Sequence, residues 1–317
     1  MRSRGRGRAA AAAVTLAACL AAAACSGPAS GPKPTGHKAA ASGHPAPADT
    51  RVPARPAPFT ASGPVVALGD SYTAGQLLPL DATANPPGCF RSTANYATTV
   101  AKALHAPGFT DAACESAGAA DIATPEKTGN GVNPPQLDAL APGDSLVMLT
   151  LGGDDLGFTH VLNDCMLLSF RNPFGRPCQA RYQGQVPGLI AGERPKMIAA
   201  LSAIHGRAPH AQVLLLGYPD LFPQHGGCWP IVPFTTGDIA FLRSAEVNLN
   251  AMLASAAAAT GTTYVDTYTA TAGHDFCQER KVKDVEGLIP TSMAYSFHPN
   301  ARGQAAMADQ ALAALGR

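Results

Sequence analysis

The sequence predicts a single α/β domain of about 250 residues, a three-layer sandwich in which helices cover both faces of a mainly parallel sheet. Three observations support this fold class. Hydrophobic residues make up 46% of the chain and charged residues 14%, so the chain can bury a sizeable core. Short, unbroken apolar runs indicate strands that are buried on both faces. These runs alternate with longer segments of helical pattern, as in sheets whose strands are connected by helices.

The individual elements follow from these runs and their flanking residues. Apolar runs predict strands at residues 65–68, 145–151, 212–217 and 262–266, and a further strand-like stretch precedes Cys114. Helical patterns cover residues 93–105, 185–205, 238–260 and 299–315. We expect a break near Pro195, because proline removes a backbone hydrogen bond inside a helix. Asp238 is the expected N-cap of its helix, and Pro299 is tolerated in a first helical turn.

Residues 1–25 predict a signal peptide. Four arginines lie in the first eight residues, and an uncharged run over residues 9–24 follows, too short to span a bilayer of about 30 Å comfortably. Cys19 and Cys25 each end a segment that resembles a lipoprotein processing box. Lipidation of Cys25 is slightly favoured over Cys19, and the alternative is ordinary cleavage without a lipid.

Residues 26–63 predict a disordered tether, because proline, alanine, glycine and serine dominate them and leave little apolar surface to bury. The folded domain is expected over residues 64–317. This part holds 15 basic and 21 acidic residues, although the whole chain has a net charge of +1. The near balance of charge over the whole chain argues against binding to nucleic acid, which normally goes with a basic excess. The expected molecule is therefore an exported or lipid-anchored domain outside the cytoplasm.

Six cysteines lie in the expected domain, and an even number in an exported chain points to disulfides. They are Cys89, Cys114, Cys165, Cys178, Cys228 and Cys277. Their spacing alone does not select a pairing. No paired Cys-x-x-Cys or His-Cys spacing is present, and no glycine-rich phosphate loop follows a predicted strand. We therefore expect neither a metal nor a cofactor.

The residues that follow the predicted strands carry the candidate site, because ligands of parallel sheets bind beyond the carboxyl ends of the strands. Gly69-Asp70-Ser71 follows the first strand and places a serine at a strand-to-helix turn. A helix N-terminus there favours a developing negative charge. Asp70 is expected to accept local hydrogen bonds rather than to act as a catalytic acid. Three further blocks follow later in the chain. They are residues 114–120, which contain Gly118, residues 151–158, which contain Gly153-Asp154-Asp155, and residues 296–304, which contain His298-Pro299-Asn300.

These four blocks, in this order, resemble the SGNH (GDSL-type) hydrolases, and most closely their secreted, three-disulfide esterase and lipase branch. The match runs from about residue 65 to residue 312. The resemblance implies a flavodoxin-like, five-stranded sheet. It also implies Ser71 as nucleophile and His298 as general base, with the N–H groups of Ser71 and Gly118 in the oxyanion hole. The disulfides it implies are Cys89–Cys114, Cys165–Cys178 and Cys228–Cys277.

Two residues depart from the family pattern. Tyr295 occupies the position where an aspartate usually orients the histidine. We expect the Tyr295 backbone carbonyl to accept the His298 Nδ1–H instead, which still fixes the tautomer. Asp154 replaces the oxyanion-hole asparagine, and an ionised carboxylate cannot donate a hydrogen bond. Asp154 could be protonated and donate, could turn away, or could mark a degenerate site, whereas Asp155 is expected to brace the turn.

The main hypothesis is an exported serine esterase or lipase that hydrolyses acyl esters through an acyl-enzyme on Ser71. Its partners would be a small-molecule or lipid ester and a membrane reached through the lipid tether, and we expect a monomer. One alternative is a weak or degenerate binding protein on the same scaffold, and another is a carbohydrate deacetylase. Aromatic residues after the strands are candidates for an acyl pocket or for ordinary packing: Tyr72, Phe158, Phe222, Trp229 and Phe234.

Overall fold

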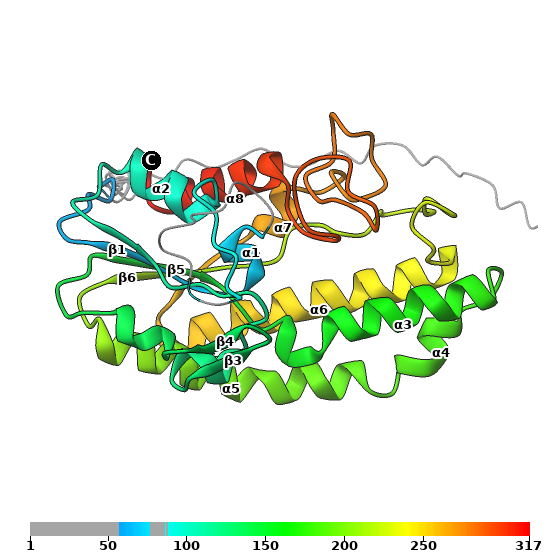
Figure 1. Cartoon of the computed structure of the whole chain (residues 1–317), viewed down its shortest axis with the longest axis horizontal. Coiled ribbons are helices and arrows are strands. Elements are labelled where there is room, and N and C mark those ends of the chain that lie inside the picture. Colours follow the sequence, from blue (N-terminus) through cyan, green and yellow to red (C-terminus); the bar gives the residue numbers. More distant parts are fainter. Residues whose placement is uncertain (1–56, 77–85, 87) are drawn as a thin grey trace, which may run out of the picture. The chain divides into compact units, whose positions relative to one another are not determined.

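The computed structural model describes residues 57–76, 86 and 88–317 (Figure 1). The expected signal peptide, with Cys19 and Cys25, and most of the expected tether lie outside these residues. The folded part begins before residue 64, because the Phe59 N–H donates to the Leu315 carbonyl and the Phe59 side chain packs on the core. None of the helices in the described part is both long enough and apolar enough to cross a bilayer.

The central sheet has five parallel strands and confirms the predicted fold class. The strands are β1 (Val65–Gly69), β2 (Phe109–Asp111), β5 (Leu146–Thr150), β6 (Gln212–Leu216) and β7 (Thr263–Val265). Their order is β2-β1-β5-β6-β7, the flavodoxin-like order with a reversal at β1. Val65 pairs with Phe109 on one side and with Leu146 on the other. All five strands run in the same direction, so their carboxyl ends lie at one edge.

Helices cover both faces of the sheet (Figure 1). One layer holds α2 (Tyr96–Ala103) and α8 (Ala301–Ala314), and the other holds α3 (Phe158–Arg171), α5 (Val186–Arg207) and α6 (Thr236–Thr260). Successive residues of β1 serve opposite layers: Val65 and Ala67 pack with α2 and α8, and Val66 and Leu68 pack with the other layer. This explains why the strands are apolar throughout rather than alternating.

The remaining elements are short. They are the helices α1 (Ser71–Ala74), α4 (Pro177–Tyr182) and α7 (Thr267–Ala270), and the turns η1 (Ala119–Ile122), η2 (Gln136–Ala139) and η3 (Asp154–Leu156). A small antiparallel hairpin joins β3 (Glu126–Thr128) to β4 (Gly131–Asn133). The sequence pattern did not predict α3 or α4.

Two helix predictions are wrong in detail. α5 runs through Pro195 without a break, since its buried residues, among them Met197 and Leu201, hold it against the core on the C-terminal side of the proline. The N-cap of α6 is Thr235, whose hydroxyl accepts the Asp238 N–H. Asp238 lies inside the first turn, where its buried carboxylate instead accepts hydrogen bonds from the Cys178 and Gln179 N–H groups of α4.

Three disulfides join Cys89 to Cys114, Cys165 to Cys178 and Cys228 to Cys277, the pairing that the family resemblance implied. The second ties α3 to α4. The third ties the loop before α6 to the loop after α7. The first and third disulfides therefore join loop to loop, and the second joins helix to helix.

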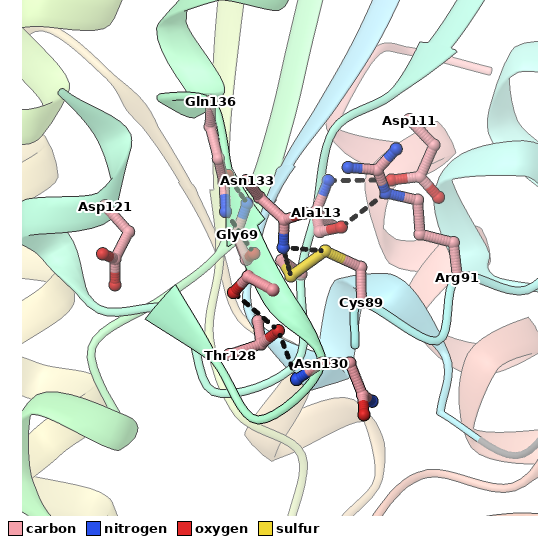
Figure 2. The surroundings of a disulfide bond; sticks show 12 residues. Gly69, Cys89, Arg91, Asp111, Ala113, Asp121, Thr128, Asn130, Asn133 and Gln136 are labelled. Atoms are coloured by element: carbon pink, nitrogen blue, oxygen red, sulfur yellow. Dashed lines mark hydrogen bonds between the residues drawn. A yellow bond between two sulfur atoms is a disulfide. The ribbon is translucent and has the colours of Figure 1, made fainter. Parts of the chain in front are cut away.

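A buried glutamine completes the end of β1 beside the first disulfide (Figure 2). β2 is shorter than β1 and leaves the Gly69 N–H without a strand partner. The Gln136 side chain takes this place: its Oε1 accepts the Gly69 N–H at 2.6 Å, and its Nε2 donates to the Gly69 carbonyl at 3.0 Å. Asn133, three residues earlier, donates to both sulfur atoms of the Cys89–Cys114 disulfide. Gln136 thus fixes the backbone two residues before Ser71.

We expect Gln136→Leu to lower the free energy of unfolding by about 1–3 kcal/mol, because the buried Gly69 N–H loses its acceptor. Chemical denaturation monitored by circular dichroism measures this change. Asp138→Asn is the matched control, since Asp138 is exposed in the same η2 turn, and it should leave the unfolding midpoint unchanged. An unchanged midpoint in Gln136→Leu would contradict this account of the end of β1.

Candidate active site

Ser71 lies at the start of α1, directly after β1. The turn needs glycine at position 69, where φ is +113° and a Cβ atom would lie 2.2 Å from the Thr150 carbonyl oxygen. Asp70 is the N-cap of α1, and its Oδ1 accepts the Tyr72 N–H at 2.9 Å. The Ser71 N–H, at the first helical position, has no intrahelical acceptor. The turn therefore presents both the hydroxyl and the N–H of Ser71 at the sheet edge.

His298 comes from the loop that leads into α8. Backbone hydrogen bonds between this loop and Glu286 hold it, from Glu286 N–H to the His298 carbonyl and from Phe297 N–H to the Glu286 carbonyl. The Tyr72 hydroxyl donates to the Phe297 carbonyl at 2.7 Å. The Gln304 side chain of α8 donates to the Tyr72 carbonyl at 3.0 Å. The loop is thereby tied directly to the turn that carries Ser71.

Ser71 Oγ lies 2.7 Å from His298 Nε2, although the two residues are 227 positions apart in the sequence. On the other side of the ring, His298 Nδ1 lies 2.8 Å from the Ser296 carbonyl oxygen. A carbonyl only accepts, so Nδ1 must carry the proton and Nε2 must be the acceptor for the serine hydroxyl. The pair has the arrangement of a nucleophile and its general base.

The prediction that the Tyr295 carbonyl accepts the His298 Nδ1–H is wrong by one residue, because the Ser296 carbonyl lies there instead. The Tyr295 carbonyl accepts the His298 backbone N–H at 3.2 Å, which closes a tight turn. Phe297 inside this turn has a positive φ of 61°, and the reversal brings the Ser296 carbonyl toward the imidazole. The sequence shows the missing aspartate but does not show this local reversal.

Burial lowers the pKa of His298 to about 4, against a smaller raising effect of the Ser296 carbonyl. Within the described residues, no carboxylate forms a hydrogen bond or ion pair with the ring that would stabilise its protonated form. The imidazole is therefore almost entirely neutral, and able to accept a proton, at neutral pH.

A buried hydrogen-bond chain links three of the loops around the site. The Gly153 N–H donates to the Tyr218 hydroxyl at 2.7 Å, and that hydroxyl donates to Asp70 Oδ2. Burial raises the pKa of Asp70 well above its usual range, and the charge of Asp154 adds to this effect. Asp70 is a hydrogen-bond acceptor within the turn, as the sequence analysis expected. Tyr218 was not predicted, and only its position after β6 could have indicated it.

Asp154 is half-buried and lines the same cavity as Ser71 and His298. Burial is the main cause that raises its pKa to about 6, and the charges of Asp155 and Glu115 add to it. Asp155 differs, because its Oδ2 accepts the Ala119 N–H at 2.6 Å and its Oδ1 lies 3.5 Å from the Lys196 ammonium. These contacts fit the bracing role expected for Asp155.

The structure differs from the expectation for Gly118. Its N–H donates to Asp121 Oδ2 at 2.8 Å, because Gly118 caps η1, and it is not among the residues that line the cavity. A Cβ atom at this position would lie 2.8 Å from Asp155 Oδ2. Close packing against the Asp155 carboxylate therefore accounts for the glycine, and the N–H of Gly118 already has an acceptor.

A cavity of about 290 Å³ opens beside the Ser71–His298 pair. Besides the residues already described, α3, α6 and the loops provide a largely apolar lining, with Phe158, Leu162, Leu221, Leu249 and Leu288. Of the candidate pocket residues, Tyr72 and Phe158 line this cavity. Phe222 and Phe234 belong to the core, and Trp229 is exposed on a loop.

In the described part of the chain, one cluster of side chains has residue types that can bind a metal ion: Cys89, Cys114 and Glu126. Its two sulfur atoms form a disulfide (Figure 2), so the group offers no thiolate to a metal.

Comparisons with known proteins agree with this geometry. A model of the GDSL-like lipase/acylhydrolase family matches residues 67–306. Lipase 2 of Streptomyces coelicolor is 37% identical over 274 residues, which cover 84% of this chain and 91% of that protein.

Two solved structures have the same fold. The chain matches the phospholipase A1 of Streptomyces albidoflavus with 29% identity and a TM-score of 0.65, over 80% of this chain and 98% of that one. It matches an extracellular lipase of Streptomyces rimosus with 29% identity and a TM-score of 0.64, over 80% and 99%. The chain therefore belongs to the GDSL-like lipase/acylhydrolase family and is an ester-hydrolysing enzyme.

Proposed function

We propose that the protein is an exported serine esterase or lipase in which Ser71 is the nucleophile and His298 the general base. The observation that carries this proposal is the 2.7 Å contact between Ser71 Oγ and His298 Nε2. Ser71 Oγ attacks the ester carbonyl carbon while Nε2 takes the hydroxyl proton. Nε2 then returns that proton to the leaving alkoxide, which departs as the alcohol and leaves an acyl-enzyme. Water, deprotonated by the same nitrogen, hydrolyses the acyl-enzyme and restores Ser71.

The Ser71–His298 pair works without the acidic residue that usually forms the third member of a catalytic triad. The Ser296 carbonyl holds the imidazole in the tautomer that accepts at Nε2. As a neutral group it stabilises the imidazolium of the transition state less than a carboxylate does. The low pKa of His298 is consistent with this, and it makes the histidine a weaker base that is neutral over a wide pH range.

The negative charge on the carbonyl oxygen needs hydrogen-bond donors. We assign the Ser71 N–H as one donor and the protonated Asp154 carboxyl as the second. Of the three roles considered for Asp154, its place in the cavity and its raised pKa favour the donating one. Gly118 is left out of this assignment, because its N–H faces Asp121.

The cavity lining supports acyl esters as the substrate class. Its largely apolar residues suit a hydrocarbon chain better than the acetyl group and sugar of a carbohydrate deacetylase. The relatives named lipases and phospholipase A1 agree with this choice. The intact contact between Ser71 and His298 also disfavours a degenerate binding protein.

Export is supported by the three disulfides, which persist in oxidising compartments, and by the signal-like residues 1–25. One matched relative is itself described as an extracellular lipase. Lipidation at Cys25 remains a prediction from the sequence.

A fluorophosphonate probe tests the nucleophile. We expect labelling of the folded protein to disappear in Ser71→Ala, and hydrolysis of a para-nitrophenyl ester to fall by a factor on the order of 10⁶. Ser244→Ala is the matched control, because Ser244 is exposed on α6, and it should keep both activities. Labelling that persists in Ser71→Ala would refute the assignment.

The pH profile of Asp154→Asn tests the second donor. Asp154 is protonated below its pKa of about 6, and His298 is neutral above its pKa of about 4, so the wild-type enzyme should be most active between these values. Above pH 6 the donor is lost, and activity should fall by about 10²–10³. An asparagine amide does not titrate, so the variant should stay active at alkaline pH. The same alkaline fall in both proteins would contradict the role of Asp154.

A further inference from the structure

A buried carboxyl group lines the apolar part of the cavity. Glu246 belongs to α6 and is only 2% exposed, yet it is one of the cavity-lining residues. Leu249, three residues later, lines the cavity too, since residues three apart share one face of a helix. Phe158 and Leu162 of α3 are four residues apart, a spacing that also puts both on one helix face, and they line the cavity as well. Glu246 is thus a buried acidic side chain beside apolar residues of the cavity lining.

The position of Glu246 relative to the Ser71–His298 pair follows from the course of α6. The Asn250 side chain accepts the Tyr218 N–H at 2.8 Å and donates to the Tyr218 carbonyl at 2.9 Å. Tyr218 in turn contacts Asp70, next to Ser71. Glu246 lies four residues before Asn250, about 6 Å along the helix axis, toward the N-terminal end of α6. An acyl chain that extends from Ser71 along α6 would therefore pass Glu246.

In the part of the chain that the structure describes, the hydrogen bonds of Glu246 leave the O–H of its neutral carboxyl group without a partner. Both carboxyl oxygens share the Leu221 N–H, at 3.1 and 3.4 Å. Burial, together with the charges of Asp220 and Asp275, raises the pKa of Glu246 well above its usual range, against the lowering effects of the Leu221 N–H and Arg243. Its neutral form carries an O–H, and no protein acceptor for that O–H is found in the described part of the chain. A buried donor without an acceptor is unfavourable.

We propose that Glu246 donates a hydrogen bond to an oxygen atom within the acyl chain, so that the enzyme prefers esters of oxygenated acyl chains to unsubstituted chains of equal length. Hydroxyl, keto and ether oxygens can all accept this bond. The inference rests on the proposed function, because it concerns the acyl group transferred to Ser71. A plain alkyl chain fills the cavity but leaves the carboxyl O–H unpaired.

An oxygen scan of the acyl chain tests the proposal. The substrates are para-nitrophenyl octanoate and a series in which an ether oxygen replaces one chain methylene at a time, which preserves the chain length. We expect at least one member of the series to exceed octanoate in kcat/KM by about tenfold or more in the wild-type enzyme. The exposed Glu279 provides a matched control, Glu279→Gln, which should keep this preference.

Two variants test whether the Glu246 side chain causes the preference for oxygenated acyl chains. Glu246→Gln keeps a donor and an acceptor and should keep the preference, whereas Glu246→Leu should lose it, measured as the ratio of kcat/KM for the best ether ester to kcat/KM for octanoate. A wild-type enzyme that treats all the esters alike within about twofold would overturn the proposal, and this holds even if Glu246→Leu fails to fold. A preference that survives in folded Glu246→Leu would overturn it too. Hydrolysis of octanoate that persists in Ser71→Ala is a distinct result, since it refutes the proposed function itself.

Discussion

The proposed chemistry depends on one hydrogen bond, between the Ser71 hydroxyl near the start of the domain and the His298 imidazole near its end. The sheet makes this contact available, because β1 leads directly into the Ser71 turn and the loop before α8 reaches the same edge. The fold then fixes it: Tyr72 bonds the histidine loop through its hydroxyl, and Gln304 of α8 bonds Tyr72 through its carbonyl. Because these bonds join neighbours of both reactive residues, the geometry of the pair depends on packing that spans the whole domain.

Burial sets the protonation states around this contact. The same loss of water that holds His298 neutral raises the pKa of nearby carboxyl groups, with Asp70, Asp154 and Glu246 affected most directly. A conventional site uses one ionised acid to orient the base. Here the ring contacts a backbone carbonyl, and burial raises the pKa values of the surrounding carboxyl groups. In this environment a carboxyl group can serve as a hydrogen-bond donor, which is the common physical basis of the roles assigned to Asp154 and Glu246.

The sequence predicted the sheet well, because strands buried on both faces are apolar at every position and stand out from the helices around them. It also predicted that Ser71 and His298 would meet, since motif order and the parallel sheet place both at one edge. It failed where local backbone geometry decides the contact. The positive φ of Phe297 selects the Ser296 carbonyl over that of Tyr295. Gln136 had no recognisable pattern, because its partner is a single backbone residue that only the paired sheet brings near it.

The protonation state of His298 can be measured by nuclear magnetic resonance titration of its imidazole, with selectively ¹⁵N-labelled histidine and with His298→Gln to assign the signal. We expect a neutral ring protonated at Nδ1 through the neutral pH range, with titration near a pKa of about 4. A ring protonated at Nε2, or a pKa at or above the ordinary histidine value of about 6.5, would contradict this expectation.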